Sequence, residues 1–366
     1  ERDGLLNRTI EFLPDDESLK ERRSHGRGLT RPELSVLLAY SKISLKDAML
    51  KSQVPDDPYF ERDLLANFPP LLVKKFGEVL VHHQLKREIV ATMLTNAVVN
   101  RMGVSFSHRL AEDHGQPRAQ IIKAYAAAHQ IYDADRYWTA IESLDNKVKA
   151  SLQYALYERA IGLLKHVTGW IVNSDMAQAP IGAIVARFAA AIPAGEKLLP
   201  DALPASYRAD WDKAVDSMVR EGVPQELAVM LANTKVLGSG PDVVELAEAA
   251  KAPLTETAQV YFEIGDRFSV LWLLSAIIGL SVQSKWQALA RANLRDDVYR
   301  LQRRLASQAL RAPGKTAQAK VEAWMAANEE VVSFARRRLN ELQTGGAADF
   351  MSLAVAVRAL RDLRTL

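Results

Sequence analysis

The spacing of apolar residues predicts helices along almost the whole chain. Thr30 with Glu33 three residues later has the form of a capping box at a helix start. Leu34, Leu37 and Leu38 follow at i, i+3 and i+4, which is the spacing of one helix face. No segment shows the period-two alternation that is typical of a half-buried strand. The pattern therefore predicts an all-α fold, a multi-helix bundle in two helical subdomains with no significant sheet.

Start and stop signals divide this pattern into elements. A long helix is expected from about Val79 to Gly103, because glycine is a common residue just after a helix end. The segment 173–206 contains four prolines and two glycines, which interrupt helices. We therefore expect an N-terminal helical bundle over 29–175, a proline-rich linker over 176–206, and a C-terminal helical bundle over 207–366.

The expected long helix carries two amides whose surroundings matter. On a helical wheel of about 100° per residue, Asn96 and Asn100 fall inside a largely apolar stripe, which comprises Leu85, Ile89, Met93 and Ala97. An unpaired buried amide costs about 1–3 kcal/mol, so each is expected to find a partner. The partners are either backbone groups of neighbouring helices or a polar contact across a subunit or domain surface.

Candidate chemistry is sparse in this sequence. The chain has no cysteine, which excludes disulfides and thiolate sites. Gly238 to Gly240 lacks the strand and the third glycine of a dinucleotide-binding loop, and is interpreted as a plain loop. His108, Glu112 and His114 resemble a metal cluster in composition only, since the spacing suggests no third ligand; surface or capping roles are preferred. We expect no catalytic, cofactor-binding or metal-binding residues.

Composition and segment lengths indicate a packed protein outside the membrane. Hydrophobic residues make up 48% of the chain and charged residues 25%, which is ordinary for a globular protein. The longest apolar run, Phe268 to Val282, is shorter than the roughly 20 residues that a membrane span needs. Residues 1–10 have neither an initiator Met nor a leader pattern, so we expect a cytoplasmic chain excised from a longer one.

Positive charge is concentrated at the end of the chain. Residues 285–366 contain 15 Lys and Arg against 8 Asp and Glu, a net +7, whereas residues 1–284 contain 32 against 36, a net −4. Clusters such as Arg336 to Arg338 could meet the phosphates of a nucleic acid. Neighbouring arginines on a helix point in different directions, however, and acidic residues are interspersed. A solvated face or an acidic protein partner is the preferred explanation, and nucleic acid is kept as an alternative.

One long motif resembles a known family. The run LTRPELSVLLAYSK at 29–42 is similar to a segment of the very large bacterial NAD-dependent glutamate dehydrogenases. Those enzymes have a catalytic core followed by a long helical C-terminal region. The resemblance continues strongly to residue 172 and moderately over 284–310, where the run WQALARANLRDDVYRLQ begins at Trp286.

The resemblance implies a parent enzyme that converts L-glutamate, NAD and water to 2-oxoglutarate, ammonia and NADH. It places residues 1–28 as a junction that follows the catalytic core. The nucleotide loop and glutamate-binding lysines of the family match no positions here, so this chain alone is expected to be inactive and to bind no cofactor. We expect a non-catalytic C-terminal module that supports domain packing, oligomer assembly or regulation.

The expected partners are the catalytic core of the same polypeptide and further copies of the chain in a homo-oligomer. A free-standing helical adaptor and a basic nucleic-acid-binding protein remain as alternatives. Polar residues in the matching segments are proposed as interface or polar-network residues, although those near helix ends can also be explained as caps. They are Arg31, Glu33, Tyr40, Lys42, Arg87, Asn96, Asn100 and Arg101.

Overall fold

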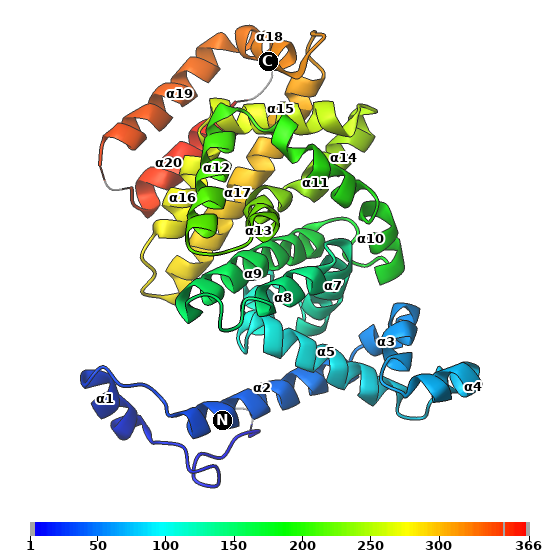
Figure 1. The fold of residues 1–366 in the computed structure, drawn as a ribbon. Helices are drawn as coiled ribbons and strands as arrows, with labels where there is room; N and C mark the ends of the chain where they lie inside the picture. The colour runs from blue at the N-terminus through cyan, green and yellow to red at the C-terminus, as the bar shows by residue number, and fades with distance from the viewer. Residues whose placement is uncertain (1–3, 347, 364–366) are drawn as a thin grey trace. The chain divides into compact units, whose positions relative to one another are not determined.

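The chain is helical throughout the part that the structure describes. A computed structural model describes residues 4–346 and 348–363. Figure 1 shows α-helices α1 to α20, accompanied by two short 3-10 helices, and the described residues contain no β-strand. The all-α prediction is therefore confirmed. In the same residues no helix combines the length and apolar character needed to cross a membrane.

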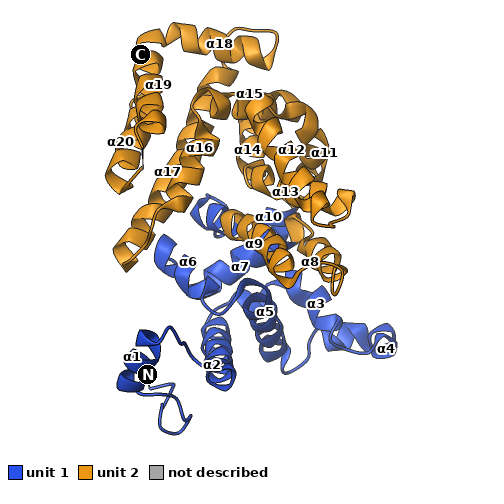
Figure 2. Cartoon of the chain, turned by 60° about the vertical axis from the view of Figure 1, so that its left-hand side comes forward, with its two compact units in different colours: residues 1–129, 168–185 blue, residues 130–167, 186–366 orange. Residues whose placement is uncertain are grey.

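The chain forms two compact units, which Figure 2 draws in different colours. Unit 1 comprises residues 1–129 and 168–185, and unit 2 comprises residues 130–167 and 186–366. Each unit thus contains two separate stretches of sequence.

The boundaries expected from the sequence remain predictions. Two helices lie within the proline-rich segment 176–206, namely α10 (Ile181–Phe188) and α11 (Ala191–Ala202). Pro200 lies inside α11, near its C-terminal end. Proline-rich sequence is therefore compatible with helix here because the breaks fall close to helix ends.

Unit 1 is built around a pair of helices in contact, α2 and α5 (Figure 2). Leu45 and Met49 of α2 are fully buried, and Val98 and Val99 of α5 are buried as well. The helices of unit 1 are α1 (Asp16–Ser24), α2 (Arg31–Leu50), α3 (Glu61–Leu65), α4 (Pro70–Leu80), α5 (Lys86–Met102), α6 (Phe106–His114), most of α7 (Arg118–Ile131), the end of α9 (Ala150–Asn173) and most of α10, with 3-10 helices at Val54–Asp56 and Pro58–Phe60.

The single helix expected from Val79 to Gly103 is wrong in its first third. The chain instead ends α4 at Leu80 and starts α5 at Lys86, with a turn between them. Apolar and helix-compatible residues continue through this turn, which is why periodicity did not detect it. The expected end at Gly103 is confirmed, since Gly103 follows α5 with a φ of +88°, a conformation that favours glycine.

Unit 2 has α15 (Leu254–Arg267) at its centre, in contact with α11, α14, α16, α17 and α18. Its remaining helices are α8 (Ala134–Glu142), most of α9 (Ala150–Asn173), α12 (Ala205–Arg220), α13 (Gln225–Leu237), α14 (Gly240–Ala250), α16 (Val270–Gly279), α17 (Lys285–Leu310), α18 (Ala317–Ala327), α19 (Glu329–Thr344) and α20 (Phe350–Arg361).

Close packing around α15 depends on one glycine. A Cβ atom on Gly265 would lie 2.2 Å from the hydroxyl of Tyr207 and 2.6 Å from Nε2 of Gln302. Neither distance is tolerated in a packed interior. Glycine at this position lets α12 and α17 approach the α15 backbone.

Candidate functional site

The residues singled out from the sequence lie on α2 and α5 of unit 1. The expected capping box is confirmed at the start of α2, where the Thr30 amide donates to Glu33 Oε2 at 2.6 Å. Arg22 of α1 forms an ion pair with the same carboxylate at 2.8 Å. Hydrogen bonds from Arg22, then from Thr30, lower the pKa of Glu33. Glu33 therefore both caps α2 and connects it to α1.

Three further residues of α2 have different surroundings. The Tyr40 hydroxyl donates to Glu11 Oε1 at 2.5 Å, and this hydrogen bond raises the pKa of Tyr40. Arg31 is exposed and Lys42 is half-buried. Neither side chain forms an ion pair or hydrogen bond with another residue in the described ranges. Arg31 and Lys42 are thus available for contacts outside these residues.

Arg87 connects the start of α5 to the end of α2. Its guanidinium donates to the carbonyl oxygens of Leu50 and Ser52 at 2.8 and 2.9 Å and pairs with the Asp56 carboxylate. The last carbonyls of a helix have no partner within that helix, so a cation here stabilises both the hydrogen bonding and the helix dipole. Arg87 is a structural residue of the α2–α5 pair. Arg101 is half-buried in the last turn of α5.

The expected burial of the amide stripe on α5 is wrong. The buried face comprises Val90, Ala91, Thr95, Val98, Val99 and Met102. Leu85, by contrast, is 55% exposed, and Asn100 is exposed. Asn96 is half-buried and lines an open hollow with Met93 and Asn67. The helix has apolar residues on two faces. The face expected to be buried, which includes Leu85 and Asn100, points away from the α2–α5 core.

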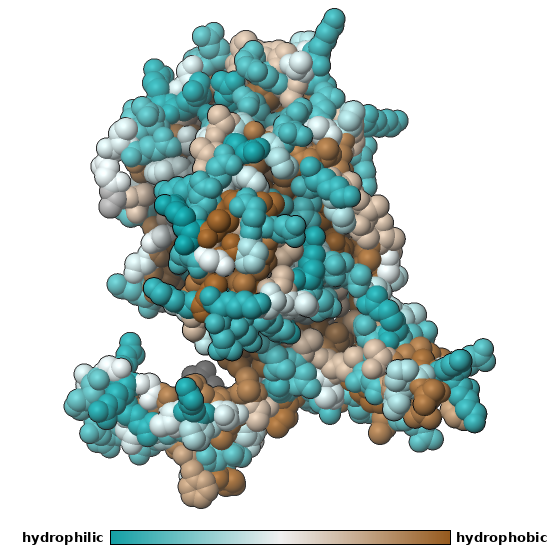
Figure 3. All heavy atoms as spheres, in the orientation of Figure 1, coloured by the Kyte–Doolittle hydropathy of each residue, from teal (hydrophilic) through white to brown (hydrophobic). Residues whose placement is uncertain are grey.

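The most unusual feature of unit 1 is α4, which has no buried residue. Leu71, Leu72, Phe76 and Val79 are 81%, 43%, 45% and 69% exposed. Phe76 has non-helical φ and ψ angles of −133° and 17°, so α4 is kinked there and these side chains do not share one regular helix face. We call these four residues the α4 patch. Figure 3 shows hydrophobic residues gathered over this part of the molecule.

A second apolar surface covers the N-terminal half of α2. Leu34, Leu37 and Leu38 are 51%, 37% and 37% exposed, whereas the buried residues of α2 lie in its C-terminal half. We call these three leucines the α2 patch. The leucine spacing in the sequence predicted this apolar stripe, but it did not predict that the stripe would be exposed among the described residues. The sequence analysis also did not predict α4 as a separate helix. Contiguous exposed apolar surface is typical of interaction sites.

The described residues offer little to hold a metal or a nucleotide. They contain no group of three His, Asp or Glu side chains positioned to ligate a metal. His108 and Glu112 form an exposed i, i+4 pair at 3.6 Å. The residues Gly238 to Gly240 join α13 directly to α14, and a Cβ on Gly240 would lie 2.5 Å from Ile192 Cδ1. These glycines therefore serve helix packing.

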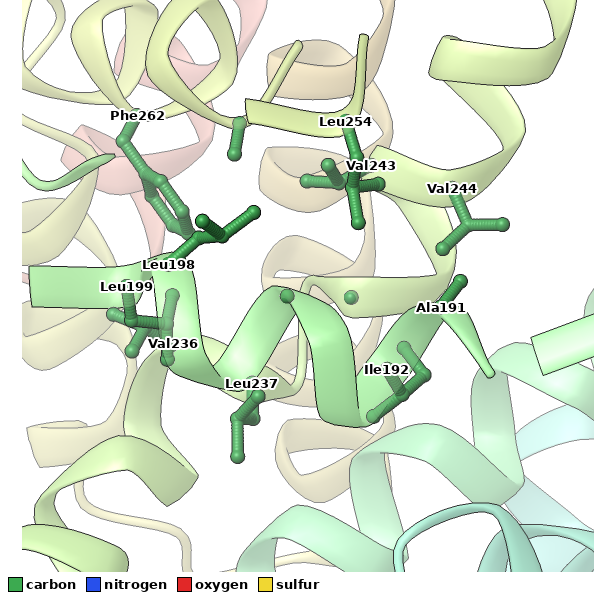
Figure 4. Close-up of a pocket in the computed structure, with 13 residues that line it drawn as sticks. Ala191, Ile192, Leu198, Leu199, Val236, Leu237, Val243, Val244, Leu254 and Phe262 are labelled. Atoms are coloured by element: carbon green, nitrogen blue, oxygen red, sulfur yellow. The ribbon is translucent and has the colours of Figure 1, made fainter. Parts of the chain in front are cut away.

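A cavity in unit 2 is entirely apolar in its lining (Figure 4). Side chains from α11, α13, α14 and α15 surround it, including Ile192, Leu199, Val243 and Phe262. Its volume is about 30 Å³. A cofactor phosphate is usually bound with the help of cationic side chains, and none lines this cavity. Its small volume and apolar side chains indicate a packing defect, not a cofactor site.

Comparison with known proteins identifies a family. A family model described as "Glutamate dehydrogenase, C-terminal" matches residues 26–362. NAD-specific glutamate dehydrogenases from Pseudomonas aeruginosa, Halomonas elongata and Mycobacterium tuberculosis are 38%, 34% and 31% identical to this chain over 98% of its length. The chain spans 22% of the length of each of these relatives. It belongs to the glutamate dehydrogenase C-terminal family.

Proposed function

We propose that this chain is the non-catalytic helical C-terminal module of a NAD-specific glutamate dehydrogenase, and that unit 1 packs against the catalytic part of the same polypeptide. The α4 patch carries the proposal. This chain matches 22% of the length of its relatives. In those proteins the remaining part of the same polypeptide could therefore supply the surface that covers the patch. The module then supports the oxidation of L-glutamate by NAD without touching either.

The energy available from such packing is substantial. Complete burial of a Leu, Val or Phe side chain contributes about 1.5–3 kcal/mol, and the α4 patch has four such side chains. Their mean exposure is high enough that most of this free energy is not used within unit 1. An apolar surface on the partner would bury the patch. Arg31 and Lys42 lie on α2 one turn from Leu34 and Leu38 of the α2 patch, where they could form polar contacts with the same partner.

Hydrogen exchange in the native polypeptide tests this packing. Exchange of α4 amides reports local opening, which becomes rarer when a helix is covered. We expect α4 to exchange at least about tenfold more slowly in the native polypeptide than in the 366-residue chain alone. Leu71→Asp should abolish that protection, because a carboxylate is costly to bury.

The chain offers a matched control for this experiment. Met351 of α20 is 79% exposed, close to the 81% of Leu71, and lies in unit 2. Met351→Asp should leave the protection of α4 unchanged. Equal exchange of α4 in the native polypeptide and in the isolated chain would contradict the proposal.

Three arginines of the basic end make contacts within unit 2, which favours a structural role for them over nucleic-acid binding. Arg303 pairs with Glu245 at 2.9 Å, and Arg361 pairs with Asp297 at 2.6 Å. Arg304 donates to the carbonyl oxygens of Leu360 and Leu363. These three arginines are held by carboxylates and helix ends, so they have little free charge for phosphates. Assembly into a homo-oligomer and a cytoplasmic location remain predictions.

A further inference from the structure

A polar hollow of about 360 Å³ lies in unit 2 where the end of α15 meets α19. This volume falls in the range of about 300–1,000 Å³ that is usual for small-molecule sites. Arg336, Asn340 and Gln343 occupy positions i, i+4 and i+7 of α19 and so share one face. The lining comprises Asp266, Arg267, Ser269, Arg336, Arg337, Leu339, Asn340 and Gln343.

Two of the three arginines in this hollow have no protein counterion. Arg267 is neutralised by Glu263 at 2.8 Å and Glu322 at 3.7 Å. Arg336 and Arg337 form no ion pair or hydrogen bond with any residue in the ranges 4–346 and 348–363. Arginines of α17 such as Arg303, by contrast, form ion pairs with nearby carboxylates.

The lining of the hollow also contains one carboxylate, that of Asp266. Asp266 accepts a hydrogen bond from the hydroxyl of Ser206. This hydrogen bond from a neutral group does not cancel the charge of the carboxylate. With Arg267 paired to Glu263, the charges of Arg336 and Arg337 against that of Asp266 leave the lining with a positive excess. An anion with several acidic oxygens would balance this excess.

Neutral hydrogen-bonding groups complete the lining. Ser269 precedes α16 with a φ of +51°, which is uncommon for a residue other than glycine, and its side chain makes no capping hydrogen bond. The amides of Asn340 and Gln343 lie on the same side of α19 as Arg336. Hydroxyl and amide groups beside guanidinium groups are suited to oxygen atoms of phosphate or carboxylate.

We propose that the hollow between α15 and α19 binds a small oxyanion, such as a phosphate or dicarboxylate metabolite, through Arg336 and Arg337. Guanidinium groups bind both kinds of oxyanion through paired hydrogen bonds. The polar lining disfavours an apolar ligand, in contrast to the cavity of Figure 4. The site lies in unit 2, so it is separate from the patches of unit 1.

Calorimetric titration of the full chain with inorganic phosphate, and separately with succinate, tests the proposal. We expect one of the two to bind at one site per chain, and the stronger binder identifies the ligand class. Arg336→Gln with Arg337→Gln should weaken binding by about tenfold or more, because two charge-assisted contacts are lost. Both positions are exposed, so the fold should be kept, and circular dichroism checks this.

Arg338 provides the matched control. It is the next residue of α19, and its guanidinium lies 5.2 Å from the ring centroid of Phe334, outside the hollow. Arg338→Gln removes the same charge and should change the affinity by less than about twofold. An equal loss in this variant would show a diffuse basic surface and overturn the proposal. Absence of binding by both probes, or binding of a single-stranded oligonucleotide in their place, would also overturn it.

Discussion

At the scale of single residues, His166 links the packing of unit 2 to pH. Its ring centroid lies 4.3 Å from that of Tyr299. Its Nε2 atom is inaccessible to solvent and has no hydrogen-bond partner among the described residues, although the residue as a whole is only partly buried. Burial, and then the charge of Arg295, lower the pKa of His166 from 6.5 to about 4. The folded protein therefore holds this imidazole neutral.

This shift predicts a loss of stability in acid. Between pH 6.5 and about 4 the unfolded chain binds a proton at His166 that the folded chain does not. The contribution is thus fully present above pH 6.5 and is lost progressively as the pH falls toward 4. We expect a decrease of about 1–2 kcal/mol in the free energy of unfolding between pH 6.5 and 5. Urea unfolding at these pH values measures it.

Substitution isolates the contribution of His166 from that of other groups. His166→Phe keeps an aromatic ring against Tyr299 but cannot take up a proton, so its free energy of unfolding should depend less on pH. His108→Gln, which changes an exposed histidine elsewhere in the chain, is the comparison variant. Identical slopes in the His166 variant and the original would refute this role.

At the scale of elements, the sequence revealed helix ends better than helix faces. The Thr30 capping box and the Gly103 stop were predictable because each depends on a few neighbouring residues. The turn after Leu80 was not, since residues compatible with helix continue through it. The buried face of α5 could not be predicted either, because Leu85 is as apolar as Val98 and only tertiary contacts distinguish them. The missing information is which face meets another part of the chain.

Arg87 gives an element-scale prediction for the junction of α2 and α5. Arg87→Met keeps most of the side-chain volume but loses the hydrogen bonds to Leu50 and Ser52 and the ion pair with Asp56. We expect a loss of about 1–3 kcal/mol in the free energy of unfolding. Arg87→Lys should recover part of it, since lysine keeps the charge but not the forked geometry. Thermal unfolding of the original protein and the two variants measures these differences. Equal stability of all three would contradict the structural role of Arg87.

At the scale of the whole molecule, family membership was recognisable from one motif, whereas the exposed apolar patches were not. The segment 29–42 suggested the family that the comparisons show. Of the residues expected at an interface, Glu33, Tyr40 and Arg87 form contacts inside unit 1. The α4 patch was missed because an apolar helix that awaits a partner has the same sequence pattern as one in a core.

The proposed division of labour predicts the activity of the isolated chain. Purified as 366 residues, it should show no glutamate-dependent reduction of NAD above the buffer background, because the proposal assigns the chemistry to the part of the polypeptide outside this chain. Absorbance of NADH measures this, with the native polypeptide as the positive control. Turnover that rises in proportion to the concentration of the purified chain would contradict the assignment.

The exposed apolar residues of α4 also have a consequence for fragments of the polypeptide that proteolysis produces. A fragment released by a protease would display Leu71, Leu72, Phe76 and Val79 together, with nothing of unit 1 above them. Chaperones bind exposed hydrophobic surfaces of this kind, and hydrophobic resins retain them. The surface proposed to join the module to its enzyme would thus also mark a released fragment for removal by cellular quality control.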